Sequence, residues 1–154
     1  MPILTSELVK RAIELVRPGI DAILNAEGTT WGPRWVCGTV KGPQDITVHF
    51  TFGEFPESEP LSSKASFYNV AQTKLEATER EQLPTSVIVT TKPWLLRGGE
   101  YLYPGGTTRD GISVAVSGAK GRTDEAIAEI VLSIVIMLAY LEMEKRIKED
   151  KMQI

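Results

Sequence analysis

The chain has 154 residues, of which 42% are hydrophobic and 24% are charged, and its formal net charge is −3. This length suits a single domain over residues 1–154 and excludes a two-domain enzyme, while the composition excludes a disordered chain. The basic residues are dispersed, so the chain is not expected to bind nucleic acid.

The first predicted element is a helix over Thr5–Asn25. Apolar residues recur there at helical spacing, and Thr5 is placed to act as its N-cap. Pro18 lies inside the pattern, and it is expected to kink the helix or to split it in two, because proline has no backbone N–H and clashes with the preceding turn.

A β-hairpin is predicted next, with strands Arg34–Val40 and Ile46–Phe52 on either side of a cluster of turn-forming residues. Apolar and polar side chains alternate in the second strand, so one face should be buried and His49 should lie on the other. Cys37 is a lone cysteine in a strand, with no basic neighbour that would activate its thiol, and is predicted to be a small buried residue.

The middle of the chain is predicted to form a helix and then a short strand. Ser62 or Ser63 can cap a helix that runs to about Thr78. Val87–Thr90 is rich in β-branched residues and is expected to be a strand, although Pro84 and Pro93 bracket it closely.

A second hairpin and a long helix complete the chain. The strands Glu100–Tyr103 and Ile112–Ser117 are predicted on either side of the glycine-rich turn 104–111. Thr123 is predicted to cap the last helix, with Asp124 and Glu125 in its first turn. Because adjacent helical residues diverge by about 100°, these two acids are expected to serve in capping and not as an acid–base dyad.

The order helix, hairpin, helix, hairpin, helix predicts an α+β fold with an antiparallel sheet of about five strands flanked by helices. The last helix is apolar on all sides over Ile130–Leu141, which is more surface than one sheet face can cover. We therefore predict a homo-oligomer that forms through this helix. The alternative is that the first helix and Trp31, Trp35 or Trp94 cover it within one subunit.

Three features predict a cytoplasmic protein that does not associate with membranes. Residues Met1–Lys10 lack the apolar stretch and cleavage site of a signal peptide. Cys37 is the one cysteine, which excludes an intramolecular disulfide and suits a reducing compartment. The apolar run Ile130–Leu141 is shorter than the roughly 20 residues that cross a bilayer.

Two segments carry candidate ligand-binding groups. The segment Ser117-Gly118-Ala119-Lys120-Gly121-Arg122-Thr123 leads into a helix N-terminus, where backbone N–H groups, Lys120 and Arg122 could receive a carboxylate or phosphate. Arg97 precedes Gly98 and Gly99, and together with Lys64 it could hold a carboxylate. For each segment the alternative is a structural turn or cap without a ligand.

The chemistry-bearing side chains are few. His49 is the one histidine, so a histidine-based metal cluster is excluded, and heme iron is the metal that it could ligate. The alternative is a surface histidine on the polar face of a strand. Glu100 and Tyr101 are the candidate acid or base groups of an enzyme that would bind a small carboxylated metabolite through Arg97 and Lys120.

Three stretches resemble the GlcG/HbpS-like family. They are Ser63-Lys64-Ala65, Gly98-Gly99, and Val116-Ser117-Gly118-Ala119 followed by Asp124-Glu125-Ala126-Ile127-Ala128. The resemblance implies a profilin-like α/β/α sandwich and compact oligomers, and it makes heme the implied cofactor. Arg97 replaces the family's usual proline or histidine, and Glu100-Tyr101 replaces small apolar residues, at the place where a ligand would enter.

The sequence thus predicts an oligomeric small-molecule-binding protein. The resemblance favours heme as the ligand, whereas the residues themselves favour an anionic organic molecule that bears a carboxylate. An enzyme acting on a small carboxylated metabolite is the alternative function, and a scaffold without a ligand pocket is a third.

Overall fold

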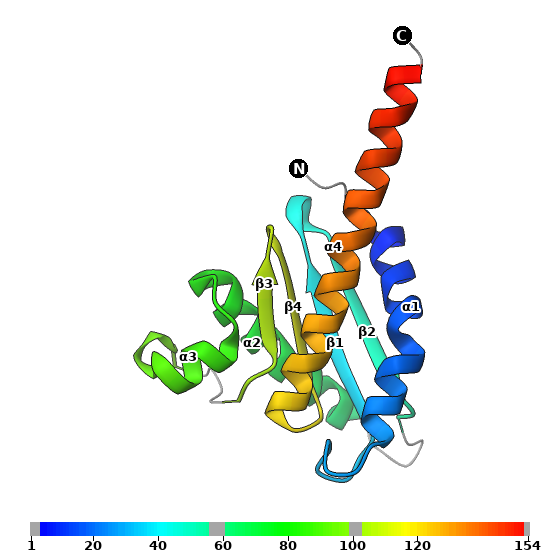
Figure 1. Ribbon diagram of the computed structural model, residues 1–154. Helices are drawn as coiled ribbons and strands as arrows, with labels where there is room; N and C mark the ends of the chain where they lie inside the picture. The colour runs from blue at the N-terminus through cyan, green and yellow to red at the C-terminus, as the bar shows by residue number, and fades with distance from the viewer. Residues whose placement is uncertain (1–3, 56–60, 99–102, 153–154) are drawn as a thin grey trace.

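The computed structural model describes residues 4–55, 61–98 and 103–152, and in these ranges four strands form one antiparallel sheet between layers of helices (Figure 1). The sheet order is β2-β1-β4-β3. The strands are β1 (Trp35–Lys41), β2 (Thr47–Gly53), β3 (Gly106–Arg109) and β4 (Ile112–Ser117). The predicted α+β fold and α/β/α sandwich are confirmed, but the described sheet has four strands and not five.

Helices cover both faces of the sheet. The first helix α1 (Ser6–Asn25) and the last helix α4 (Gly121–Met152) lie on one face, and α2 (Leu61–Glu81) lies on the other (Figure 1). The short helix α3 (Thr85–Thr91) contacts α2, β3 and α4. Short 3₁₀ turns, η1 (Pro43–Asp45) and η2 (Pro93–Leu95), occur in two of the connections.

Helix α1 begins where the sequence predicts. The side chain of Thr5 accepts a hydrogen bond from the Leu8 N–H at 3.1 Å, which confirms the N-cap. The predicted split at Pro18 is wrong, because one continuous helix runs through it. Pro18 is exposed, whereas Val16 and Ile20 on either side of it are buried, so core packing holds the helix together across the missing N–H.

The first hairpin and α2 also agree with the prediction. The two strands lie within about one residue of the expected ranges, with Thr39 opposite His49, and His49 is exposed. Helix α2 buries Ala71 and Leu75 against the sheet as expected, but it is longer than predicted and ends at Glu81. It begins at Leu61, so Ser62 and Ser63 lie inside it and the prediction that one of them caps it is wrong.

The predicted strand Val87–Thr90 is wrong, because this segment lies in the helix α3. Its threonines adapt to the helix by bonding backward: the hydroxyls of Thr90 and Thr91 donate to the carbonyls of Ser86 and Val87, at 2.6 Å each. This back-bonding and the tertiary contacts of α3 outweigh the β-propensity of the segment.

The second hairpin is shorter than predicted. Strand β3 lies inside the segment expected as a turn, and the true turn is Asp110–Gly111, whose φ angles of +56° and +78° are those of a tight two-residue hairpin. Gly106 serves close packing, because a Cβ there would lie 2.8 Å from the Lys74 carbonyl oxygen of α2. The expected strand Glu100–Tyr103 is not confirmed, since residues 99–102 lie outside the described residues and Tyr103 precedes β3.

Helix α4 begins at Gly121, so Thr123 lies inside the helix and the prediction that it is the cap is wrong. By length and composition alone α4 could cross a membrane, a property that core helices of globular proteins share. Its residues Val131, Leu132 and Val135 are fully buried in the core. The C-terminal part of α4 extends beyond the edge of the sheet (Figure 1).

The alternative in which tryptophans cover α4 is not what the described residues show. Trp31 and Trp94 are among the most exposed large side chains. Trp35 is buried, but it packs against Phe67 of α2, on the face of the sheet opposite α4. Helix α1 covers one side of α4, and Met137 and Leu141 of α4 are left exposed.

Candidate functional site

A pocket lies where β4 ends and α4 begins, beside the N-terminal half of α2, and we call it the junction pocket. Its volume is about 370 Å³. Its walls are mainly apolar and aromatic, and a few polar groups lie among them. The lining residues are Trp31, Pro33, Ser66, Phe67, Val70, Lys74, Tyr103, Ser117, Gly118, Ala119, Gly121 and Asp124.

Gly118 allows the chain to turn from β4 into this pocket. Its φ angle is +132°, and a Cβ at this position would lie 2.8 Å from the Trp35 carbonyl oxygen and 3.1 Å from the Val36 Cα of the neighbouring strand. Only glycine fits this conformation and spacing without strain. The Ser-Gly pair at the end of β4 is therefore explained by the geometry of the turn.

A buried ion pair forms the inner wall of the junction pocket. The Nζ of Lys74 lies 3.2 Å from Oδ2 of Asp124 and donates to the Val116 carbonyl oxygen at 3.0 Å. The other carboxylate oxygen of Asp124 accepts from the Ala119 N–H at 2.9 Å. Each of the two side chains is only 3% exposed. The pair therefore joins α2, the end of β4 and the start of α4.

Burial shifts the protonation of both partners toward the neutral forms. Desolvation raises the pKa of Asp124 to about 7, although Lys74 and the hydrogen bond from Ala119 oppose the shift. Desolvation also lowers the pKa of Lys74, against the opposing effects of Asp124, Cys37 and Glu125. A proton on Lys74 can therefore pass to Asp124 at a lower free-energy cost than it would between the same groups in water.

Cys37 lies near this pair. It is fully buried, as predicted, and it faces Ser117 across the sheet ladder. The interpretation that no basic group lies beside it is wrong, because Cys37 acts electrostatically on Lys74, which comes from α2. Neighbours along a strand cannot reveal a residue that a helix brings over that strand.

Glu125 points away from Asp124, as expected for adjacent helical residues. Its carboxylate accepts from the Ser86 N–H at 2.9 Å, and the Thr85 hydroxyl lies 3.4 Å from the same oxygen. The Thr85 oxygen in turn accepts from the N–H of Gly105 at 2.8 Å. The two acids are not an acid–base dyad: Asp124 holds Lys74 and the loop before α4, and Glu125 holds α3.

The predicted ligand-binding residues separate into two places. Ser117 and Gly118 line the junction pocket, and the ammonium of Lys120 lies 5.1 Å from the ring centre of Trp31, one of the pocket walls. Arg122 is exposed, with a guanidinium nitrogen 3.9 Å from the Glu125 carboxylate.

Arg97 and Gly98 line a different groove, together with Lys41, Thr73, Glu76, Glu79 and Arg80. Arg97 and Gly98 therefore do not line the cavity that Ser117 and Gly118 line. Gly99, Glu100 and Tyr101 lie outside the described residues, and so does the side chain of Lys64, whose backbone belongs to α2.

His49 lies on the α2 side of β2, away from the junction pocket lining. Its Nδ1 is hydrogen-bonded to the Thr39 hydroxyl at 2.8 Å, and its ring meets that of Tyr68 edge to face at 5.5 Å. Over the described part of the chain, no group of three or more His, Cys, Asp or Glu side chains is arranged to hold a metal ion.

The sequence interpretation missed Lys74 and the aromatic walls. A usable signal was present for Lys74, because it falls one helical turn after Val70 and Ala71 on the stripe that α2 buries. A lysine at such a position needs a buried carboxylate partner, since an unpaired buried charge is costly. Trp31, Phe67 and Tyr103 come from three separate segments and give no such signal.

The comparisons identify the fold. No family model matches the chain, and no curated protein sequence is significantly similar to it. The structure of HbpS matches with a TM-score of 0.55 and 19% identity, over 87% of this chain and 91% of that one. The chain has the fold of HbpS. A double mutant of Streptomyces reticuli HbpS matches with the same TM-score and identity, over 87% of this chain and 88% of that one.

A third solved structure extends the likeness. Klebsiella pneumoniae protein ORFY, of family DUF336, matches with a TM-score of 0.50 and 15% identity, over 86% of this chain and 90% of that one. The resemblance to the GlcG/HbpS-like family that three sequence motifs suggested is thus confirmed at the level of the fold. At these identities the HbpS-like fold does not identify a ligand.

Removing one member of the buried pair should destabilise the protein more than removing both. Asp124→Asn keeps an oxygen for the Ala119 N–H but leaves the Lys74 ammonium without its counter-charge, which should cost about 3–5 kcal/mol. Adding Lys74→Met should recover much of this loss in chemical denaturation. Purely additive losses of the two variants would show that the pair is not coupled.

The pair should also make stability depend on pH. Because the folded pKa of Asp124 is about 7 and its ordinary value is 3.8, its contribution to stability should fall as the pH rises from about 4 to about 7. Because burial lowers the pKa of Lys74, the contribution of Lys74 to the free energy of unfolding should increase as the pH rises toward its ordinary pKa of 10.5. Cys37 and Glu125, which also act on Lys74, stay in the double variant, so the difference between wild type and double variant reports the pair together with the effect of Lys74 on these two groups. A difference that does not change with pH would contradict this.

Proposed function

We propose that the chain is a small-molecule-binding protein whose ligand occupies the junction pocket. The observation that supports this proposal is a concave, largely apolar cavity with a few convergent polar groups, which is the usual character of a ligand site. Its volume of about 370 Å³ suits a small organic molecule.

The lining favours a ligand with an aromatic or aliphatic body and a polar or anionic end. Trp31, Phe67 and Tyr103 offer rings for the body. Lys120 beside Trp31 supplies positive charge near the pocket.

Heme is the second candidate ligand, and the orientation of His49 favours it. In the tautomer in which Nδ1 donates its proton to the Thr39 hydroxyl, Nε2 has a free lone pair. His49 could then hold a heme iron through Nε2. The His49 ring is exposed and lies outside the junction pocket. That pocket would therefore not enclose a heme whose iron is bound to His49.

An enzyme acting on a small carboxylated metabolite is the alternative function. Its predicted acid or base groups, Glu100 and Tyr101, lie outside the described residues. Arg97 and Lys120, its predicted binding groups, line or flank different cavities. This separation favours binding in the junction pocket over the predicted arrangement of the enzyme.

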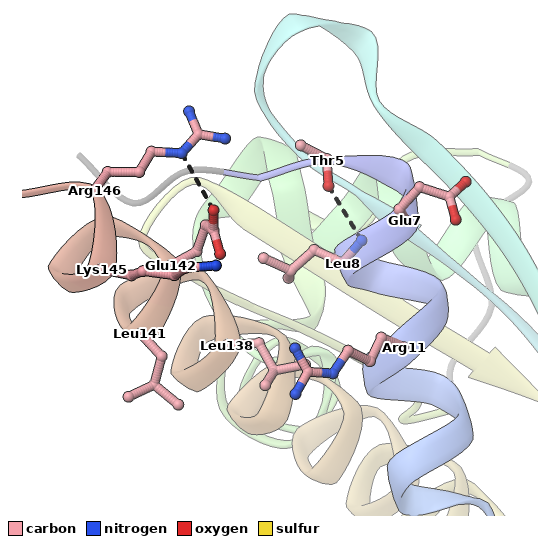
Figure 2. A pocket seen from close by; sticks show the side chains of 9 residues that line it. All are labelled: Thr5, Glu7, Leu8, Arg11, Leu138, Leu141, Glu142, Lys145 and Arg146. Atoms are coloured by element: carbon pink, nitrogen blue, oxygen red, sulfur yellow. Dashed lines mark hydrogen bonds and ion pairs between the residues drawn. The ribbon is translucent and has the colours of Figure 1, made fainter. Parts of the chain in front are cut away.

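We further propose that the chain forms a homo-oligomer through α4. Met137, Tyr140, Leu141 and Ile147 of this helix are each at least 40% exposed. A groove of about 450 Å³ lies between α4, which lines it with Leu138 and Leu141, and the start of α1 (Figure 2). It is lined by Thr5, Glu7, Leu8, Arg11, Leu138, Leu141, Glu142, Lys145 and Arg146. Its mixture of acids and bases beside apolar residues suits a second copy of the same surface.

A cytoplasmic location, with no nucleic-acid or membrane partner, remains part of the proposal. Its support is the net charge of −3, the burial of Val131, Leu132 and Val135 of α4 in the core, and the one cysteine, Cys37.

An aromatic anion should bind in the junction pocket. We expect 1-anilinonaphthalene-8-sulfonate, followed by its own fluorescence, to bind wild-type protein saturably at about one site per subunit. Val70→Trp should fill the pocket and weaken binding at least tenfold. Gln72→Trp adds the same side chain at an exposed position of the same helix and should bind like wild type. Equal binding by the two variants would exclude this pocket.

Hemin should distinguish the two ligand candidates. If His49 ligates iron, an absorbance titration of wild type should show a saturable Soret shift near one hemin per subunit, weakened in His49→Ala. Thr39→Val, which removes the hydrogen bond to Nδ1, should weaken it less. A small, non-saturating change, equal in all three proteins, would exclude heme at His49.

Charge on the exposed face of α4 should break the oligomer. We expect light scattering after size-exclusion chromatography to show wild type as an oligomer and Met137→Glu/Leu141→Glu as a smaller species, because burying carboxylates in an apolar interface is costly. Leu15→Glu changes another exposed leucine, on α1, and should keep the wild-type mass. An unchanged mass in the α4 variant would contradict the proposed interface.

A further inference from the structure

The Lys74 side chain is both buried and placed beside the junction pocket. Lys74 is one of the residues that line the junction pocket, yet its side chain is only 3% exposed. The amine is held in place by the Val116 carbonyl oxygen, the Asp124 carboxylate and the backbone of Gly105, where a Cβ would lie 2.7 Å from Nζ. A fixed amine therefore stands beside a pocket for small molecules.

The surroundings of this amine also favour its nucleophilic form. A lysine attacks only when neutral, and burial in apolar surroundings lowers its pKa. Asp124, at 3.2 Å, can take the proton that the ammonium gives up. The other groups that act on the amine are Cys37 of β1 and Glu125 of α4, and both favour the ammonium. The carboxyl of Asp124 is thus the local proton acceptor.

We propose that Lys74 forms a reversible imine with an aldehyde or ketone bound in the junction pocket. This inference rests on the proposed function, because it needs a small molecule in that pocket. It adds a covalent step and a ligand class: a carbonyl compound with an aromatic or aliphatic body, which Phe67 and Tyr103 would contact beside the amine.

The step is balanced within the site. The Nζ lone pair forms a bond to the carbonyl carbon, and the π electrons of the carbonyl move to its oxygen. The nitrogen gives up its two hydrogens as protons, the oxygen takes them and leaves as water, and a carbon–nitrogen double bond remains. Asp124 lies where it can carry these protons between nitrogen and oxygen. Neither an oxidant nor a reductant is needed.

Reductive trapping tests the proposal. Wild-type protein is treated with cinnamaldehyde and sodium cyanoborohydride, digested, and mapped by mass spectrometry. We expect at least tenfold more adduct at Lys74 than at any other lysine, and the same preference in Lys10→Arg, which removes an exposed amine on α1. Adducts spread over exposed lysines without a preference for Lys74 would overturn the proposal.

Two further samples separate this inference from the proposed function. Val70→Trp keeps Lys74 but fills the pocket, and it should lose the Lys74 adduct; undiminished labelling of Lys74 in this variant would overturn the proposal. Cinnamyl alcohol has the same body without a carbonyl and should compete with trapping in wild type. If the alcohol competes with 1-anilinonaphthalene-8-sulfonate but no Lys74 adduct forms, the pocket stands and the imine is wrong. If Val70→Trp binds that probe as well as wild type does, the proposed pocket itself is wrong.

Discussion

The contact between Lys74 and Asp124 determines how the end of the sheet is built. Taking an ammonium and a carboxylate out of water is costly, and the two charges repay that cost only when they meet with good geometry. Here the amine reaches from α2 across β4 to the start of α4, and the carboxylate also binds the Ala119 N–H. Three elements from distant parts of the sequence are thereby fixed around one buried position.

The neighbouring glycines follow from this constraint. Gly105 leaves room for the Lys74 side chain, and Gly106 leaves room for the backbone of α2. Gly118 lets β4 turn against β1 and places Ala119 within reach of Asp124. The junction pocket lies beside the pair, and Trp31, Phe67 and Tyr103 are among the residues that line it. Structure and candidate site therefore depend on the same few residues.

The sequence was informative where local periodicity and packing agree. The alternation around His49 in β2 and the helical spacing of α1 predicted both elements and their buried faces. Local propensity failed where distant contacts decide the outcome. Val87–Thr90 has the composition of a strand but lies in a helix. Gly105 and Gly106 have the composition of a turn, but Gly105 precedes β3 and Gly106 begins it, because α2 packs on both glycines.

The candidate site was predictable only in part. Ser117 and Gly118 were identified from the turn before the last helix, and they do line the pocket. Arg97 was grouped with them by chemistry, but it lies in another groove, because sequence spacing does not tell which edge of α2 a loop will approach. Lys74 could be suspected from its place on a buried stripe. Its partner Asp124 could not, since their pairing spans fifty positions.

The HbpS-like fold accounts for the arrangement of the helices and strands. The side chains that line the pocket determine which ligand it can bind. The central claim is that ligands bind beside the Lys74–Asp124 pair. The most direct test is amide chemical-shift mapping by NMR during titration with 1-anilinonaphthalene-8-sulfonate. We expect saturable shifts to cluster at residues 66–74 and 117–121. Shifts that cluster instead around Arg97 and Glu76, or along α4 beyond Met137, would contradict the account.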